Sequence, residues 1–407
     1  MSRPKILFYS TQVTNLWGGS EKFWYEAVLH PRVRDQFECY VALRDNPLTR
    51  FYGDHLRSLG VGVEFYSEPT PTLLDSLSNR LKKAVLQTNS RIKPYRYYYP
   101  WLVEGIDRQH PSLVWFNVAS AFHAQSLSHA AAVCIKKNIP YWLVVHHAFE
   151  HSFLYDDETT EEFATVLEGA RRVFCVALRN RLVLERMMGR HLKNVSLTVP
   201  ALRHEFLEDA LTLSTSKPIR ISGTARLLNV ARFDPACKGQ HILLEVLSAP
   251  KWRDRDWLLT LQGGGRLASL LKRLVDFYGH SPDRVQLREH SEDVLSVIGE
   301  SDLVVMPSLS EGTPFALSEA IACGRPGVGT PVGGIPELLV EGETGWLARS
   351  TEVADVADAL ERAWEQRTRW PQLGANGQKK VEALYDQDLI IAELVKALLQ
   401  DINQPIT

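Results

Sequence analysis

Short apolar runs alternate with amphipathic segments along most of the chain, in a strand–helix rhythm. Because repeated strand–helix units fold into parallel sheets with helices on both faces, the pattern predicts an α/β fold. The expected strands are Ile6–Tyr9, Phe37–Leu43, Val61–Phe65, Leu113–Asn117, Tyr141–Val145, Val173–Val176, Leu227–Arg232, Trp257–Leu261, Val285–Arg288 and Leu303–Met306. The expected helices are Lys22–Leu29, His55–Leu59, Arg179–Met188, Ile242–Leu247, Phe315–Cys323, Val353–Gln366 and Leu389–Leu399.

The length and composition of the chain narrow its class. A chain of 407 residues is too long for one ordinary core, so we expect two domains. A net charge of −2 gives no support for nucleic-acid binding. The five cysteines are scattered, without a CxxC pair, which favours a reducing compartment over a disulfide framework or a zinc site. No apolar run reaches the roughly 20 residues of a membrane span, and the N-terminus lacks a signal-peptide core. We therefore expect a cytoplasmic protein.

Two carboxylates follow the expected strand Leu303–Met306, within the stretch Ser308–Pro326. Glu311 lies in a polar loop, and Glu319 lies about one turn inside the helix expected over Phe315–Cys323. The N-terminus of that helix offers unpaired N–H groups and the positive end of a dipole, which suit a phosphate. A phosphate flanked by two carboxylates that hold hydroxyl groups describes a nucleotide-sugar site. A plain α/β scaffold is the alternative that this stretch leaves open.

Cations and glycines occupy other strand-to-helix loops. Arg232 can bind a diphosphate with two parallel hydrogen bonds and Lys238 as a point charge, although surface salt bridging is an alternative for both. Gly18 and Gly19 lie in one glycine loop and Gly264 lies in another, where backbone can come close to a ligand. A simple tight turn is the alternative at the first loop. That loop lacks the GxGxxG fingerprint, which argues against a nicotinamide or flavin cofactor.

A histidine pair ends the expected strand Tyr141–Val145. Open α/β sheets bind ligands at the carboxyl ends of their strands, so His146 is a candidate to hydrogen-bond a substrate or to transfer a proton. His147 and His151 lack a carboxylate or cysteine partner at a motif spacing, which argues against a metal site. Farther upstream, the basic and aromatic segment Arg80–Trp101 suits a peripheral contact with the inner membrane face or an anionic acceptor. An ordinary solvated loop is the alternative there.

Together these features resemble the family 4 retaining glycosyltransferases of the GT-B fold. Glu311 and Glu319, with seven residues between them, match that family's E-x7-E signature, and the other motifs occur in the family's order. Most of the resemblance lies between Asn229 and about Leu347. The motifs that carry it are Arg232, Lys238-Gly239, Gly333-Gly334-Ile-Pro-Glu337, the N-terminal loop Gly18-Gly19-Ser20-Glu21, and the strand from Ile139-Pro140 to His146.

The resemblance implies two Rossmann-like domains with parallel sheets facing an interdomain cleft. It places the acceptor in residues 1–205 and the nucleotide-sugar donor in residues 227–385. The polar composition of residues 206–226 marks a linker between them. The resemblance also implies that the helix in residues 386–407 returns to the N-terminal domain. Such an enzyme serves polysaccharide or glycoconjugate biosynthesis.

The resemblance further implies roles for individual residues. Arg232 and Lys238 would stabilise the donor diphosphate, Glu319 would hold the ribose, Glu311 the transferred sugar, and His146 would contact that sugar near its reacting carbon. No metal and no bound cofactor would be needed, because the donor, a UDP- or GDP-sugar, is a substrate. The acceptor would be a glycan, a lipid-linked sugar or a small molecule. The other expected donor-binding positions are Gly18, Gly19, Gly264, Thr313, Pro314, Phe315, Ala316 and Leu317.

Three positions depart from the family pattern. Val199-Pro200-Ala201 replaces an asparagine before proline, Gln286–His290 lacks a glycine beside the nucleotide base, and Ala177 replaces a frequent serine. The competing hypotheses are a GT-B sugar phosphorylase, a nucleotide-sugar epimerase and a non-catalytic sugar-nucleotide binder. A phosphorylase needs a second phosphate site and an epimerase needs acid/base carboxylates facing the sugar ring, and neither is evident. The intact charged motifs argue against a mere binder.

Overall fold

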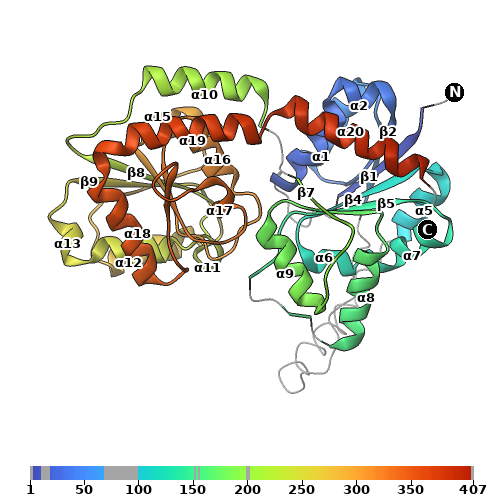
Figure 1. The fold of residues 1–407 in the computed structure, drawn as a ribbon, viewed down its shortest axis with the longest axis horizontal. Helices are drawn as coiled ribbons and strands as arrows, with labels where there is room; N and C mark the ends of the chain where they lie inside the picture. The colour runs from blue at the N-terminus through green and yellow to red at the C-terminus, as the bar shows by residue number, and fades with distance from the viewer. Residues whose placement is uncertain are drawn as a thin grey trace.

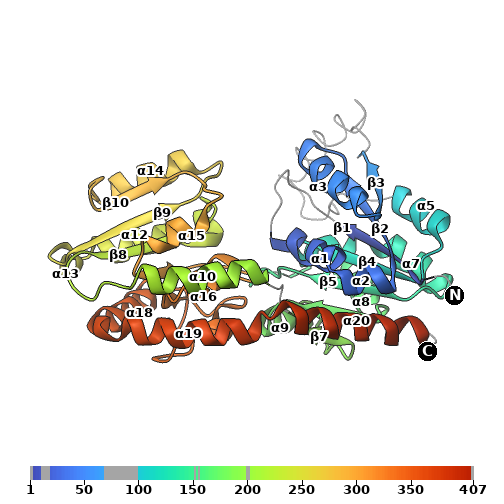
Figure 2. The ribbon, with the colours of Figure 1, turned by 90° about the horizontal axis from the view of Figure 1, so that it is seen from above.

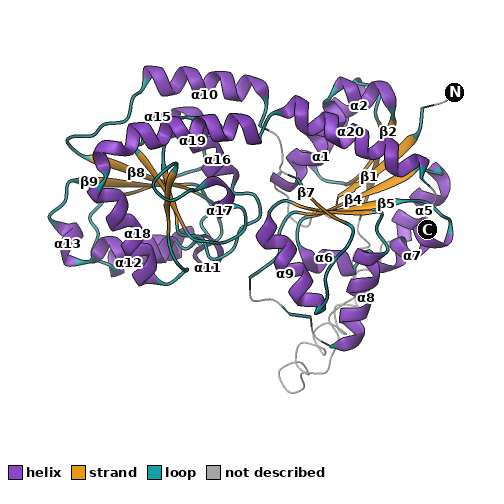
Figure 3. Cartoon of the chain, in the orientation of Figure 1, coloured by secondary structure: helices purple, strands orange, loops and turns teal. Residues whose placement is uncertain are grey.

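The computed structural model describes residues 3–10, 19–67, 100–150, 153–154, 156–198 and 202–404. Within them the chain forms two α/β units side by side, each with a central sheet flanked by helices (Figures 1 and 3). The first sheet has the strand order β3-β2-β1-β4-β5-β6-β7, and the second has the order β10-β9-β8-β11-β12-β13. Every strand pair in both sheets is parallel. The predicted fold of two Rossmann-like domains is confirmed.

The strands lie close to their predicted positions. The first sheet comprises β1 (Lys5–Ser10), β2 (Glu38–Arg44), β3 (Gly62–Tyr66), β4 (Leu113–Val118), β5 (Tyr141–Val145), β6 (Arg172–Cys175) and β7 (Val195–Leu197). The second comprises β8 (Ala225–Val230), β9 (Trp257–Gln262), β10 (Val285–Arg288), β11 (Leu303–Met306), β12 (Gly327–Gly329) and β13 (Gly345–Leu347). The three-residue strands β7, β12 and β13 were not predicted, because they are too short to show a hydrophobic period.

Helices cover both faces of each sheet. The first half of the chain holds α1 (Gly19–Leu29), α2 (Pro31–Gln36), α3 (Pro47–Ser58), α5 (Pro100–Gln109), α6 (Ala121–Gln125), α7 (Ser128–Lys136), α8 (Asp157–Glu168) and α9 (Leu178–Met188). The second half holds α10 (His204–Ser216), α11 (Pro235–Lys238), α12 (Gln240–Ser248), α13 (Pro250–Arg253), α14 (Ala268–Phe277), α15 (Val294–Gly299), α16 (Phe315–Ala322), α17 (Ile335–Leu338), α18 (Val353–Glu365), η1 (Arg367–Arg369), α19 (Trp370–Leu384) and α20 (Gln387–Asn403).

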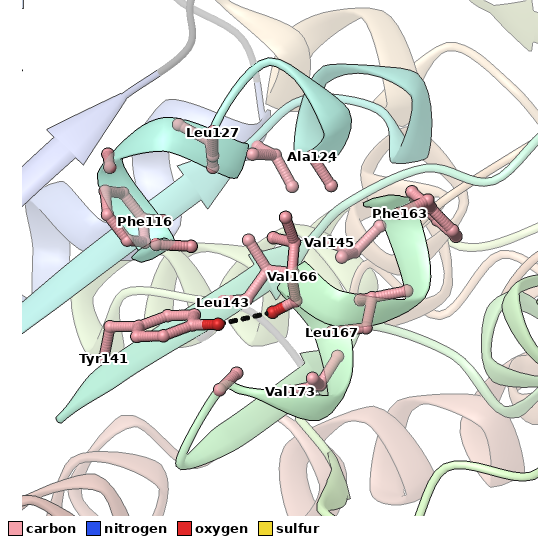
Figure 4. Close-up of a cluster of buried hydrophobic side chains, with 14 of the residues drawn as sticks. Phe116, Ala124, Leu127, Tyr141, Leu143, Val145, Phe163, Val166, Leu167 and Val173 are labelled. Atoms are coloured by element: carbon pink, nitrogen blue, oxygen red, sulfur yellow. Dashed lines mark hydrogen bonds between the residues drawn. The ribbon is translucent and has the colours of Figure 1, made fainter. Parts of the chain in front are cut away.

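Alternating side chains along each strand build a core on each face of the sheet. In β1, Leu7 and Tyr9 join one buried cluster, and Ile6 and Phe8 join the other. This is the two-residue period of a strand that is buried on both sides. Figure 4 shows the first of these clusters where β5 packs against α8. There the Tyr141 hydroxyl donates to a carbonyl oxygen of α8 at 2.7 Å, so its buried polar atom is satisfied.

The strand order creates a switch point in each sheet, because the connections run to opposite sides of β1 and of β8. Open α/β sheets bind ligands at such points, beyond the carboxyl ends of the strands. In the second sheet the switch lies between β8 and β11, whose following loops carry Lys238 and Glu311. In the first sheet it lies between β1 and β4, and His146 follows the next strand, β5. The fold therefore gathers these three predicted site residues at strand ends.

The last helix crosses from the second unit to the first, where α20 lies along the outside of the sheet (Figure 2). Its buried hydrophobic side chains are Ile391, Leu394, Val395 and Leu398, and their spacing places them along one apolar stripe of the helix. They join the core beneath α1 and α2. Asp401, which is 2% exposed, accepts from the Trp142 indole at 2.7 Å and from the Arg172 guanidinium at 3.0 Å. These contacts fix the end of the helix to β5 and β6.

Part of the segment that we expected to be a linker is helical. Residues 204–216 form α10, and Ala210 is buried in the core of the second unit, against α15 and α16. The serines and threonines at its C-terminal end produced the loop-like composition. The apolar spacing of Leu207, Ala210 and Leu213, which all face this core, outweighs that composition.

The basic and aromatic segment lies largely outside the described residues, so its proposed membrane contact stays a prediction. Its last residue, Trp101, belongs to α5 and stacks on Tyr66 with ring centroids 3.5 Å apart, so this aromatic side chain packs within the domain. None of the described helices has the length and apolar character needed to cross a bilayer.

Replacing Asp401 with alanine should destabilise the first domain by about 2–4 kcal/mol, because the buried Trp142 indole and the partly buried Arg172 guanidinium lose their acceptor. Urea denaturation followed by tryptophan fluorescence measures the change. Asp388→Ala is the matched control on the same helix. Asp388 is 71% exposed and pairs with Arg32 at 3.8 Å, so its loss should cost less than about 1 kcal/mol. Equal effects of the two substitutions would contradict this account of α20.

Candidate active site

The site is centred on an ion pair between the loops that follow β8 and β11. Lys238 Nζ lies 2.7 and 2.8 Å from the two carboxylate oxygens of Glu311, and the Ser308 hydroxyl donates to the same carboxylate at 2.8 Å. Glu311 is buried, with 5% of its surface exposed. The structure thus brings together two of the predicted catalytic residues, which are 73 positions apart in sequence.

A glycine allows the two loops to meet. Gly239 ends α11 with φ 63°, and a Cβ there would lie 1.8 Å from the carbonyl oxygen of Pro307. A side chain is therefore excluded both by the left-handed backbone and by space. Next to this contact, the backbone N–H groups of Leu309 and Ser310 donate to the carbonyl oxygen of Cys237. These bonds hold the Lys238 loop against the Glu311 loop.

Arg232 lies at the edge of the same site. It is half-exposed, and its guanidinium is 3.2 Å from the carboxylate of Asp234. The predicted glycine loop packs beside it, because the Gly264 carbonyl oxygen accepts from the Phe233 N–H at 2.8 Å. A Cβ on Gly264 would meet nothing within 4 Å, so the surface beside that glycine is open.

We predicted that the start of α16 forms a phosphate cradle. The helix begins at Phe315 without a side-chain cap. Two of the expected N–H groups are already bonded, since Phe315 donates to the Thr313 carbonyl and Leu317 to that of Pro314. The Thr313 hydroxyl is buried and has no partner in the part of the chain that the structure describes. Ala316 lies in the same first turn.

Glu319 lies one turn farther along α16, where the charge of a lysine from the first domain acts on it. Burial raises the pKa of Glu319, and the charge of Lys22 opposes that rise. Lys22 belongs to α1 and sits 5.9 Å from the centre of the Phe315 ring. A Cβ on Gly19 would lie 2.5 Å from that ring, so the start of α1 touches the start of α16. Gly18 lies outside the described residues.

The two histidines after β5 have different surroundings. His146 is buried, and its Nε2 lies 2.7 Å from the Asn117 side-chain oxygen, in the first domain. His147 reaches the opposite domain, where its Nε2 lies 2.7 Å from the Ser310 hydroxyl, beside Glu311. Burial lowers the pKa of His146 to about 3 and that of His147 to about 4, so both are neutral at pH 7.

The two domains also touch through their backbones. A Cβ on Gly312 would lie 1.9 Å from the carbonyl oxygen of His146. The Glu337 carboxylate, from the predicted Gly-Gly-Ile-Pro-Glu motif, accepts from the Leu178 N–H of α9 at 2.6 Å. The Glu311 loop and this motif therefore lie directly against the carboxyl edge of the first sheet.

Sequence reasoning missed Asn117, Lys22, His147 and Ser310 as parts of this site. A signal existed for Lys22, which directly follows the glycine motif and is presented by the same helical turn. His147 stood out only as half of the histidine pair, and Asn117 and Ser310 gave no signal, because their partners come from distant segments. No group of three or more His, Cys, Asp or Glu side chains among the described residues is arranged to hold a metal ion.

Residues 224–366, which surround the Lys238–Glu311 pair, match the family model described as glycosyl transferases group 1. Much of the second unit is therefore similar to the glycosyl transferases group 1 domain. This match supports the expectation of a glycosyltransferase. Membership of family 4 and retention of the anomeric configuration stay predictions.

Curated relatives match this chain over part of their length. N-acetyl-alpha-D-glucosaminyl L-malate synthase of Bacillus anthracis is 29% identical over 136 residues, 33% of this chain and 35% of that protein. The amylovoran biosynthesis glycosyltransferase AmsK of Erwinia amylovora is 27% identical over 219 residues, 52% of each. In these two alignments the chain thus spans about a third to a half of the relatives' length.

Solved structures share the complete two-domain fold. Anabaena HepE in complex with UDP and glucose has a TM-score of 0.70 at 18% identity, covering 98% of this chain and 100% of that one. A glycosyltransferase from Rickettsia africae has a TM-score of 0.71 at 13% identity, covering 99% and 100%. This likeness shows that the two domains adopt the GT-B arrangement.

The buried histidines predict acid sensitivity. Their folded-state pKa values lie below the ordinary 6.5, so between about pH 6.5 and 4 the unfolded chain binds more protons than the folded one. The stability that they contribute is complete above pH 6.5 and is lost as the pH falls, by up to about 1.4 kcal/mol per pH unit for each histidine. Melting temperatures at pH 7 and pH 5 should differ less in His146→Gln than in the natural protein. The exposed His290, changed to glutamine, should leave the difference intact; an unchanged difference in His146→Gln would refute the prediction.

Proposed function

We propose that this protein is a retaining glycosyltransferase. It moves a sugar from a nucleotide-sugar donor to a glycan, lipid-linked or small-molecule acceptor, without a metal ion. The observation that carries the proposal is the Lys238–Glu311 pair, held at the switch point of a unit similar to the glycosyl transferases group 1 domain. The relative AmsK, named for amylovoran biosynthesis, favours a glycan acceptor, and HepE, solved with UDP-glucose, favours a UDP-sugar over a GDP-sugar as donor.

The charges at the site suit a departing diphosphate. Lys238 Nζ uses two of its three N–H groups on Glu311, so the third is left for a phosphate oxygen. Arg232 has five N–H donors and shares one with Asp234, so its fork can bind two phosphate oxygens. Fixed cations of this kind stabilise the negative charge that grows on the leaving group, without reorganising during the reaction.

Transfer then proceeds on one face of the sugar. The bond from the anomeric carbon to the leaving phosphate oxygen breaks, and a bond to the acceptor hydroxyl oxygen forms on the same face. The acceptor proton moves to the leaving phosphate oxygen, so no protein base is required. Glu311 holds hydroxyl groups of the transferred sugar, Glu319 holds the ribose, and Lys22 approaches from the first domain as a third cation.

The donor is identified by a nucleotide-sugar panel. Thermal shift and mass spectrometry with UDP-, GDP-, ADP- and TDP-sugars, all with EDTA present, should yield one nucleotide sugar that stabilises the protein and is slowly hydrolysed. Hydrolysis that requires an added metal ion would contradict the metal-independent mechanism. Absence of binding by every member would contradict the nucleotide-sugar proposal.

Removing either cation should lower turnover by about 100-fold or more, because each stabilises charge in the transition state. The variants are Arg232→Ala and Lys238→Ala, assayed by nucleotide release in the presence of acceptor. Lys251→Ala is the matched control, since Lys251 also pairs with a glutamate in the same domain, at 2.8 Å, but lies away from the site residues described above. It should retain near-normal turnover. Near-normal rates in both site variants would refute the proposed mechanism.

A further inference from the structure

Asn117 joins three segments beneath the site. It lies near the end of β4, is 1% exposed, and sits between the start of α1 and the end of β5. Its side-chain nitrogen donates to the backbone carbonyl oxygen of Ser20 at 3.1 Å. Its side-chain oxygen lies 2.7 Å from Nε2 of His146. Neither the charges of the site nor the proposed transfer explains why a buried amide stands here.

The chemistry of these contacts fixes which histidine nitrogen carries the proton. A backbone carbonyl can only accept a hydrogen bond, so the amide group of Asn117 that faces Ser20 must be the nitrogen. Its oxygen therefore faces His146, and the atom 2.7 Å from it must be a protonated nitrogen, because two acceptors repel each other. If the ring were turned over, a carbon atom would lie too close to that oxygen. His146 thus carries its hydrogen on Nε2.

The other ring nitrogen is left as an acceptor. Burial keeps His146 neutral, and its ring forms a T-shaped contact with the Phe23 ring, with centroids 5.8 Å apart. The nearby carboxylate of Glu21 accepts hydrogen bonds from the Ser10 hydroxyl and the Trp24 indole. Among the described residues, Nδ1 of His146 has no hydrogen-bond partner. Nδ1 can therefore accept a hydrogen bond from a ligand.

We propose that Asn117 is a positioning residue that holds His146 as the Nε2–H tautomer, so that Nδ1 accepts a hydrogen bond from a hydroxyl group of the donor sugar. The choice of donor rests on the function proposed above. A sugar hydroxyl can donate to this nitrogen, whereas a carboxylate in the same place presents only acceptors. A donor that carries a hydroxyl group at this position should therefore bind more tightly than one that carries a carboxylate there.

Histidine NMR tests the tautomer without any ligand or turnover. In the full chain labelled with ¹⁵N-histidine, one buried residue should show a protonated Nε2 and an unprotonated Nδ1 at pH 7, and His146→Gln should remove and so assign that signal. Asn117→Asp places a carboxylate beside Nε2, so its His146 should become protonated at a higher pH than in the natural protein. The opposite tautomer, or a charged ring at pH 7 in the natural protein, would overturn the proposal.

Asn180→Ala is the matched control. The Asn180 amide donates to the backbone carbonyl oxygen of His146 at 3.3 Å, so it contacts the same residue but not the ring. The His146 ring signals in this variant should keep the Nε2–H pattern. Loss of the pattern in Asn180→Ala as well as in Asn117→Asp would show that general loosening, not the Asn117 side chain, sets the tautomer, and would overturn the proposal.

Donor selection is measured with two matched pairs, UDP-glucose against UDP-glucuronic acid and GDP-mannose against GDP-mannuronic acid. In the pair that binds, the neutral sugar should bind at least about 10-fold more tightly than the uronic acid. Asn117→Asp should reduce this ratio of affinities. Equal or tighter binding of the uronic acid would overturn the proposed selectivity. If no member of either pair binds, the result would count against the nucleotide-sugar function instead. The role of Asn117 would then be tested by the NMR experiment alone.

Discussion

Backbone contacts that only glycine permits determine the geometry of this site. Gly239 touches the Pro307 carbonyl, which brings the loop after β8 against the loop after β11. Gly312 touches the His146 carbonyl, which brings the second of these loops against the first domain. A methyl group at either position would clash with the facing carbonyl oxygen and push the loop away. The hydrogen bonds beside that contact would then be too long to form. The pairing of Lys238 with Glu311 depends on the first contact, and the approach of His147 to Ser310 depends on the second.

The charges at the centre of the site are matched by partners, whereas among the described residues Glu319 is balanced only by the charge of Lys22. Glu311 is the most enclosed carboxylate, and it is matched by Lys238 and the Ser308 hydroxyl. Arg232, which is more exposed, pairs with Asp234. Pairing lowers the cost of burying a charge, and a lysine or arginine keeps spare N–H donors after it has paired. The same side chains can thus be stable in the fold and still attract an anionic ligand.

Much of the architecture could be predicted because its signals are local. The strands β1 to β6 and β8 to β11 are rich in apolar residues, and Lys238 and Glu311 lie in the segments that follow two of them. Elements without a local signal were missed: β12 is three residues with two glycines, and α10 has the composition of a linker. The role of Asn117 could not be predicted at all, since a buried asparagine in a strand acquires meaning only from Ser20 and His146, which lie 97 and 29 positions away.

The departure at Ala177 shows how a contact between domains can replace a local one. A serine at the N-cap of α9 would accept from the first N–H groups of that helix, and alanine cannot. The Glu337 carboxylate of the second domain accepts from the Leu178 N–H instead. Burial raises the pKa of Glu337, while this hydrogen bond and the charge of Lys380 oppose the rise. The Leu178 N–H therefore has this acceptor only while the two domains are in contact. The absence of a local cap thus favours the contact between the domains.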